Sequence, residues 1–414
     1  MRGPQPTPYP AGEMSKEPLL TKNFVLACLI TLASFSSFYF LLATLPVYVI
    51  GEAGGTEAQV GLIIGVFSGT TVLLRPLIGW GADAWGRRLF IIAGNAIMAL
   101  AGGLYALTRT VPLLLGLRVF HGVGWAAFGT STSALVADVV PRHRRGEAMG
   151  YYGMFSNLAM AVGPALGIAL MTGYSFNALF AASAAMGVVA LGLSLFLSEP
   201  SKGRHPASGA VARPPSQEPA PSATRGVIEV TALFPGLVLA LTSATYGSIV
   251  SFLPLFAFSE RITDNPGVFF TVYAVVLIVA RGFTGQISDR YGRPAVIAPG
   301  LLLAAVALWV LAAADTLALL LVVAVLYGLA FAAVQPAIMA MVVDRAAPER
   351  RGAAMGTFSA AMDLGIGVGS IVWGIVAQAA GYHAMYLASG GVALVALAVF
   401  LVGVRRRLSL PTNR

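Results

Sequence analysis

The sequence is short of charge, cysteine and lysine. Only 10% of the 414 residues are charged, whereas a soluble globular domain usually has about 25%. Cys28 is the only cysteine, which excludes a disulfide framework and a cysteine-based metal site, and no other metal site is expected. With three lysines the chain has no Gly-x-x-x-x-Gly-Lys-Ser/Thr loop, and it lacks His-Glu-x-x-His, Gly-x-Ser-x-Gly and Cys-x-x-Cys. Neither an ATP-driven pump nor an enzyme with a conventional active site is therefore expected.

Long apolar runs fill the chain instead. Hydrophobic residues make up 57% of it, and its mean hydropathy is +0.81. A helix needs about 20 apolar residues to cross roughly 30 Å of hydrocarbon. Twelve runs approach or exceed that length, at 24–49, 60–80, 89–108, 112–138, 148–172, 176–198, 229–257, 267–287, 295–313, 317–343, 353–379 and 384–404. The sequence therefore predicts an all-α membrane protein with twelve transmembrane helices.

The formal net charge of +9 has a topological explanation. If the N-terminus faces the cytoplasm, the exposed segments on that side hold 21 Lys and Arg residues, and those on the opposite side hold two, Arg109 and Arg261. This asymmetry is the positive-inside pattern. We expect a multi-pass protein of the cell (inner) membrane with both termini in the cytoplasm, and no nucleic-acid partner.

A polar segment divides the twelve spans into two sets of six. Residues 199–228 are rich in Pro, Ser, Ala and Gly, which predicts a flexible cytoplasmic linker. The predicted domains are a cytoplasmic N-terminal tail (1–23), a six-helix bundle (24–198), the linker (199–228), a second six-helix bundle (229–404) and a cytoplasmic C-terminal tail (405–414).

The two bundles are homologous. At a shift of 206 residues, charged residues and glycines of the first fall on identical residues of the second: Arg75 on Arg281, Gly79 on Gly285, Asp83 on Asp289, Gly122 on Gly328 and Asp138 on Asp344. Homologous six-helix bundles of parallel topology are typical of transporters that rock around a substrate site between the bundles, near the bilayer midplane.

The clearest motif is GWGADAWGRR at 79–88, between the second and third predicted spans, which recurs as GQISDRYGRP at 285–294. It resembles the loop signature of the major facilitator superfamily, Gly-x-x-x-Asp-x-x-Gly-Arg-Lys/Arg, with Pro294 replacing the second basic residue in the second copy. The matching residues are Gly79, Asp83, Gly86, Arg87, Arg88, Gly285, Asp289, Gly292 and Arg293. The resemblance covers the whole chain and implies the major facilitator fold.

This resemblance implies a gating role for the two motifs. Asp83 is expected to latch the halves together in the outward-facing state and to release them when the protein opens inward, and Asp289 is its counterpart. A carboxylate at the membrane face can accept hydrogen bonds from a helix N-terminus. In the alternative interpretation, Arg87 and Arg88 only anchor the loop at the lipid headgroups.

Two charged residues lie deep in predicted spans. Arg118, in RVFHGVG, resembles the fourth-helix signature Arg-x-x-x-Gly-x-Gly of the same superfamily, where the arginine is implicated in proton transfer. Asp363 is the only acidic residue deep in any span, and we expect it to couple protons or to bind a cationic substrate. The alternatives are a purely structural arginine and an aspartate that braces a glycine-rich helix contact. Whether the two residues pair is left open.

Aromatic and polar residues of several spans are candidates for the substrate pocket. His121 and Trp125 follow Arg118 at one-turn intervals on one helix face. The first helix of each three-helix unit lines the cavity in the fold that the resemblance implies. The candidates are Tyr39, His121, Trp125, Tyr246, Tyr327 and Gln335. For each of them, ordinary packing is the alternative.

The fifth predicted span resembles the Gly-Pro-x-x-Gly-Gly motif of the twelve-helix drug:proton antiporters. Gly150, Gly163, Pro164 and Gly167 match, whereas Ala159 and Ile168 stand where glycines are expected. Small residues here are expected to let spans five and eight pack closely between the halves. The motif favours export over uptake.

The sequence thus predicts a secondary active transporter that works by alternating access, by proton-coupled efflux (antiport) of a small organic compound, in the manner of multidrug carriers. The alternative is a proton-coupled or facilitative importer of a small metabolite. The scarcity of charge in the spans favours an apolar or weakly cationic substrate. No cofactor is expected beyond the proton gradient as energy source. The expected partners are the substrate, protons and the lipid bilayer, and a monomer suffices.

Overall fold

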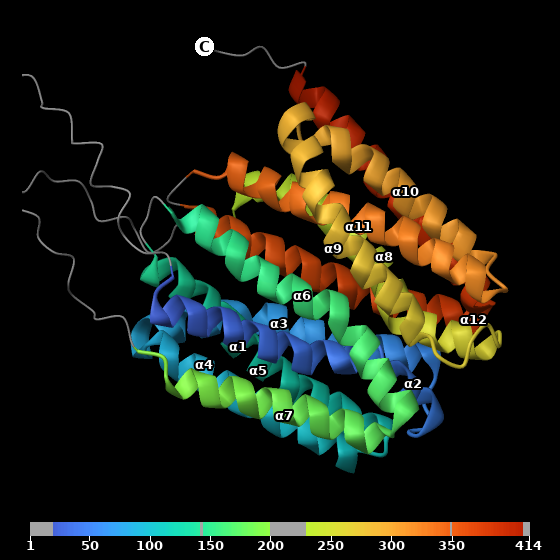
Figure 1. Ribbon diagram of the computed structural model, residues 1–414, viewed down its shortest axis with the longest axis horizontal. Coiled ribbons are helices and arrows are strands. Elements are labelled where there is room, and N and C mark those ends of the chain that lie inside the picture. Colours follow the sequence, from blue (N-terminus) through green and yellow to red (C-terminus); the bar gives the residue numbers. More distant parts are fainter. Residues whose placement is uncertain (1–19, 141–143, 199–228, 348–349, 409–414) are drawn as a thin grey trace, which may run out of the picture.

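The computed structural model describes residues 20–140, 144–198, 229–347 and 350–408, and within these ranges the protein is helical (Figure 1). The first half contains α1 (Lys22–Leu42), α2 (Leu45–Gly51), α3 (Glu57–Trp85), α4 (Arg87–Leu104), α5 (Val111–Val139), α6 (Arg145–Gly173) and α7 (Phe176–Leu195). The second contains α8 (Leu233–Ser259), α9 (Gly267–Tyr291), α10 (Pro294–Ala312), α11 (Leu317–Arg345) and α12 (Arg351–Leu408). Most of the predicted tails and the linker 199–228 lie outside the described residues.

Eleven helical segments are long and apolar enough to cross a membrane in the described part of the chain. Twelve separate spans were expected, and the difference arises in α12, which contains both of the last two predicted spans. At Gly381 the backbone leaves the helical region (φ 81°, ψ 170°) and two helices meet across a kink. This positive φ suits glycine, which has no Cβ to clash. His383 then contacts the end of α10, and Phe400 stacks on Phe234 at the start of α8, so the chain crosses the molecule a second time.

Helix ends follow local capping rules. The side chains of Thr21, Ser175 and Thr316 accept a backbone N–H at the start of α1, α7 and α11, and Thr56 forms a capping box with Gln59 at the start of α3. These caps satisfy N–H groups that the first helical turn leaves unpaired. They explain why the helices begin where the polar loops end.

The two copies of the glycine motif break the chain at equivalent places. Gly86 (φ 99°) separates α3 from α4, and Gly292 (φ 87°) separates α9 from α10. Both φ angles lie in the region that residues with a Cβ avoid, so the motif glycines are required by the turn. The internal repeat is therefore a repeat of structure at this point.

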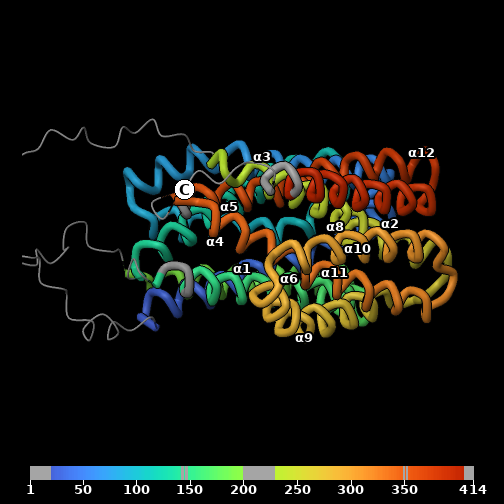
Figure 2. Tube along the Cα trace, turned by 90° about the horizontal axis from the view of Figure 1, so that it is seen from above, coloured from blue at the N-terminus to red at the C-terminus, as the bar shows by residue number. Residues whose placement is uncertain are grey.

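The two halves lie side by side, and in Figure 1 most of α1–α7 (blue to green) fills the lower part of the view and most of α8–α12 (yellow to red) the upper part. We call the end where α1 begins the Lys22 end and the end where α2 finishes the Gly51 end. The long helices run from one of these ends to the other, and α3 lies beside α12 (Figure 2). The main contacts between the halves are α3 with α12 and α6 with α9.

These contacts are tightest at the Gly51 end. A Cβ on Gly61 of α3 would collide with the backbone of Ser370 in α12, and one on Gly374 would collide with the backbone of Glu57. The Tyr382 hydroxyl also donates to Glu57 Oε1 across the halves (3.2 Å). The helices at the Lys22 end are not pressed together in this way: a Cβ would meet no atom of the other half within 4 Å at Gly79, Gly150, Gly153, Gly285 or Gly356.

Candidate functional site

An ion pair joins the halves in the middle of the molecule. Arg75 Nη2 of α3 lies 2.5 Å from Asp363 Oδ2 of α12, and the side chains are 21% and 18% exposed. Arg75 precedes the end of α3 by ten residues and Asp363 follows the start of α12 by twelve, so both lie roughly 15–18 Å from the Lys22 end. The deep carboxylate expected at Asp363 is there, and its partner is Arg75 rather than Arg118.

Arg75 is the site residue that the sequence interpretation missed, although two signals pointed to it. It is an arginine well inside a predicted span, which is itself a reason to expect function, and the 206-residue repeat matches it with Arg281. The same repeat places Asn157 opposite Asp363. The equivalent of the Arg75–Asp363 pair would therefore be Arg281 with Asn157, in which the carboxylate is replaced by an amide. Arg281 Nη2 donates instead to Gln335 Oε1 of α11 (3.1 Å).

Arg118 lies apart from this pair, on α5. It follows Val111 by seven residues, which places it roughly 10 Å from the Gly51 end. The side chain is fully buried, and none of its three guanidinium nitrogens has a hydrogen-bond partner among the described residues. Its nearest aromatic neighbours are Phe67, with the ring centre 5.1 Å from the guanidinium carbon, and Tyr105 at 5.8 Å.

The other candidates of the first half form an aromatic cluster with Arg118. His121 Nδ1 lies 3.2 Å from the Tyr105 hydroxyl, and Trp125 packs on Phe38 with ring centres 4.4 Å apart. Tyr39 is buried beside the cluster, its ring 5.2 Å from that of Phe38. The helical spacing placed Arg118, His121 and Trp125 on one face of α5, and all three are buried in the structure.

The second half brings Tyr246 and Tyr327 together with a residue that the sequence did not single out, Tyr273 of α9. The Tyr327 hydroxyl lies 3.0 Å from Thr245 Oγ1, and the Tyr273 and Tyr327 rings are 6.3 Å apart. The buried hydroxyls of Tyr246 and Tyr273 have no hydrogen-bond partner within the described ranges. Tyr273 lies on α9 and Tyr327 on α11, the two helices that the hydrogen bond from Arg281 to Gln335 joins.

Both copies of the loop motif form charge clusters inside their own half. Arg87 pairs with Asp83 (2.9 Å) and with Asp138 of α5. Arg293 repeats this with Asp289 (2.5 Å) and Asp344 of α11 (3.4 Å). The hydrogen bond that Arg293 donates to Asp289, together with the negative charge of Asp344, raises the pKa of Arg293 above its ordinary value. The repeat had matched Asp138 with Asp344 without assigning them a role.

The expected latch is not closed in this conformation. The Asp83 side chain is 70% exposed, and the partner that the described residues offer it is Arg87 of the same half. Arg88 donates to the Leu195 carbonyl oxygen at the end of α7 (2.9 Å). The close contacts between the halves described above lie at the Gly51 end instead.

The packing role predicted for the α6 glycines needs correction. Gly163 and Gly167 face α1 in their own half, where a Cβ would collide with Tyr39 and Phe40. No atom would lie within 4 Å of a Cβ on Gly150, and α6 continues through Pro164 to Gly173. The contact between α6 and α9 pairs Gly267 with Ile168, a large residue where the motif has glycine.

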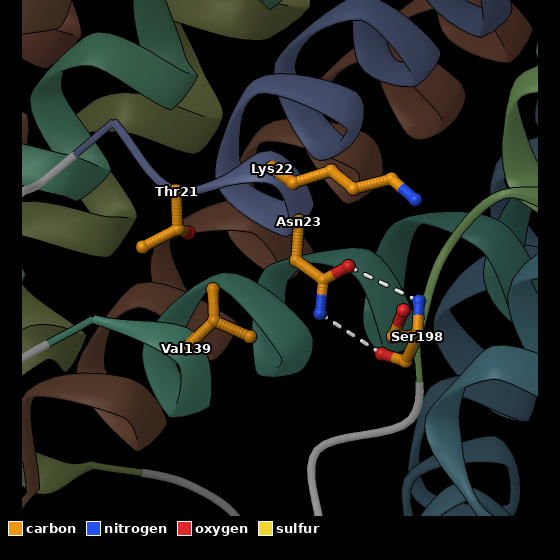
Figure 3. Close-up of a pocket in the computed structure, with 5 residues that line it drawn as sticks. All are labelled: Thr21, Lys22, Asn23, Val139 and Ser198. Carbon is orange, nitrogen blue, oxygen red and sulfur yellow. Dashed lines mark hydrogen bonds between the residues drawn. The ribbon is translucent and has the colours of Figure 1, made fainter.

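A shallow surface hollow at the Lys22 end is a different feature from this central region. It is lined by Thr21, Lys22, Asn23, Val139 and Ser198. Figure 3 shows the Asn23 side chain bridging to the Ser198 backbone through two hydrogen bonds, of 2.9 and 3.0 Å. These bonds tie the start of α1 to the end of α7, and the hollow lies at the helix ends, away from Asp363.

A comparison with sequence models of protein families identifies the family over nearly the whole chain. The family model of the Major Facilitator Superfamily matches residues 27–269 and 264–413. The chain belongs to the major facilitator superfamily. An MFS-type transporter of Salmonella typhimurium, STM4428, whose name marks it as uncharacterized, is 29% identical over 368 residues, which cover 86% of this chain and 90% of the relative.

Solved structures of this superfamily share the fold. The human organic anion transporter MFSD10 superposes with a TM-score of 0.68 at 20% identity, covering 93% of this chain and 100% of that one. A bacterial homologue of the human lysosomal transporter Spinster, inward-facing and occupied, gives 0.74 at 16% identity, covering 94% and 98%. The protein is thus a multi-pass membrane transporter of the MFS type.

Proposed function

We propose that this protein is a secondary active transporter that exports a small organic compound in exchange for protons by alternating access. The observation that carries the proposal is the Arg75–Asp363 pair, which joins the two halves near the middle of the spans. A carboxylate at that depth is costly unless it has a partner, and such residues mark proton relays in transporters. Both halves of the site come from one chain, so a monomer suffices.

The pair provides a way to couple protons to the rocking motion. A proton that binds to the Asp363 carboxylate removes the negative charge that holds the Arg75 guanidinium, which weakens the attraction between α3 and α12. Loss of the proton restores the attraction. Proton binding thus biases the contact between the two halves, and the gradient supplies the energy without any cofactor.

The Lys22 end is assigned to the cytoplasm. This assignment is supported by the 21 Lys and Arg residues of the segments on that side. The conformation with the Gly51 end packed and Asp83 released is then the inward-facing one. The partial antiporter motif of α6 supports export, and a proton-coupled or facilitative importer is the competing function.

Proton movement in sealed proteoliposomes tests the proposal. Wild-type protein and Asp363→Asn are challenged with a panel of anionic, neutral and cationic compounds while an entrapped dye reports the lumenal pH. At least one compound should release protons through the wild type. Asp363→Asn should reduce the rate at least about tenfold, because the amide cannot carry a proton in the cycle.

Asp315→Asn is the matched control, because Asp315 lies exposed in the loop between α10 and α11. It should behave like the wild type. Transport of a compound by the wild type without any pH response would contradict proton coupling and leave a facilitative carrier. Undiminished coupling in Asp363→Asn would remove Asp363 from the mechanism.

A further inference from the structure

The charges inside the spans do not balance. Four charged side chains lie more than six residues from a helix end in the described part of the chain: Arg75, Arg118, Arg281 and Asp363. Asp363 is paired with Arg75. The partner seen for Arg281 is the neutral Gln335, and no charged partner is found for Arg118 among the described residues. The uncompensated charge of these four side chains is positive, which favours an anionic group on the substrate over the apolar or weakly cationic compound that the composition suggested.

Of the two arginines without a carboxylate partner, Arg118 needs a ligand more than Arg281 does. Its side chain is fully buried, and among the described residues no carboxylate pairs with it. The polar group beside it is the Tyr105 hydroxyl, and its Nε, Nη1 and Nη2 atoms make no hydrogen bond of ordinary geometry within the described ranges. Contacts with the rings of Phe67 and Tyr105 stabilise the charge, but they leave the N–H groups unused. A guanidinium in a span is costly unless it meets a partner, and its planar fork matches a carboxylate or another oxyanion.

A second donor stands beside it. The Tyr105 hydroxyl can donate to His121 Nδ1 at 3.2 Å. In that tautomer His121 Nε2 carries its hydrogen, and this buried atom has no hydrogen-bond partner in the described part of the chain. The His121 ring lies 5.4 Å from the Phe67 ring and 6.2 Å from the Phe38 ring. Unused donors therefore adjoin a surface of aromatic rings.

We propose that Arg118 and His121 form a subsite for the anionic group of the substrate, and that the substrate is an organic anion with an aromatic or apolar body. The carboxylate or other oxyanion accepts hydrogen bonds from both side chains, and the body packs on Phe38, Phe67 and Trp125. Arg118 lies toward the Gly51 end, which is packed here, so the subsite is closed in this conformation. The inference rests on the proposed transport function.

Three probes of the same shape and different charge test the subsite: benzoate, benzamide and benzamidine. Binding of radiolabelled benzoate to the full-length protein in nanodiscs is measured, with the unlabelled probes as competitors. Benzoate should compete at least about tenfold better than benzamide or benzamidine, because the subsite offers the charged guanidinium of Arg118 to an anion. Arg118→Gln should weaken benzoate binding at least about tenfold, and Arg118→Lys should weaken it less, because the charge remains but the fork is lost.

Two controls separate this site from the rest of the mechanism. Arg281→Gln removes the other arginine that has no carboxylate partner, and it should change benzoate binding by less than about threefold. Asp363→Asn should abolish proton coupling and leave benzoate binding intact, so failure of the subsite and failure of the proposed function give different results.

His121→Phe, which removes only the second donor, should weaken benzoate binding several-fold. It serves as the test of the subsite if Arg118→Gln does not fold.

A wild type that does not bind benzoate, or that prefers benzamidine, would overturn the proposal. The same conclusion would follow if folded Arg118→Gln bound benzoate as the wild type does.

Discussion

Arg75→Gln is expected to reduce transport to below about a tenth of the wild-type rate, as strongly as a change at Asp363 itself. Arg75 is the ion-pair partner of Asp363 across the two halves. Without it, Asp363 must either remain charged and unpaired inside the span or hold its proton permanently. Both outcomes stop the proton cycle. The destabilisation should be roughly 1–2 kcal/mol, below the cost of breaking a fully buried pair, because both side chains are about one fifth exposed.

A double-mutant cycle separates the structural part of this effect from the coupling part. In Arg75→Gln with Asp363→Asn, the two amides can hydrogen-bond and no charge is left unpaired, so thermal stability should return toward that of the wild type. Proton release should stay absent, because no group on either side can carry the proton. Unfolding temperature and lumenal pH are measured on the same four proteins. Wild-type proton release by Arg75→Gln alone would show that the pair has no part in coupling.

Gly61→Val is expected to stop transport for a different reason, by preventing closure of the Gly51 end. Gly61 of α3 lies directly against the backbone of Ser370 in α12, and backbone cannot move aside as a flexible side chain can. A valine there should shift the population toward the conformation that is open at this end. The transport rate should fall to below about a tenth of that of the wild type, because one half of the cycle becomes inaccessible.

Cysteine labelling shows whether the Gly51 end has opened. Cys28 is the only cysteine, so Cys28→Ala provides a cysteine-free background. Ser68→Cys introduces a thiol on α3 at a buried site that lies against Gly367 of α12 in the other half. In the presence of Gly61→Val it should react with a membrane-impermeant maleimide at least about tenfold faster.

Gly69→Val is the matched control. It lies eight residues further along the same helix, where a Cβ would meet no atom within 4 Å. It should leave transport and labelling close to the wild type. Equal losses in both variants would mean that valine disturbs α3 itself, and an unchanged labelling rate in Gly61→Val would contradict the closure described for the Gly51 end.

The sequence alone determined the features that depend on neighbouring residues. Hydropathy placed the spans, because each helix must satisfy its backbone internally and present apolar side chains to lipid. The 206-residue repeat identified the two halves, and the motif glycines Gly86 and Gly292 stand at the turns that need a positive φ. The depth of Asp363 also followed from counting residues along its span.

The tertiary structure decided which faces of these helices meet. Asp363 contacts Arg75, which is 288 residues away in the chain, and Arg118 has neither of them as a partner. Gly163 and Gly167 adjoin α1 rather than α9. Hydropathy and periodicity are local, whereas these contacts depend on how each helix is rotated about its axis and on which end of the two halves is packed. That orientation is set by the summed packing of many side chains from both halves, which no single segment of the sequence contains.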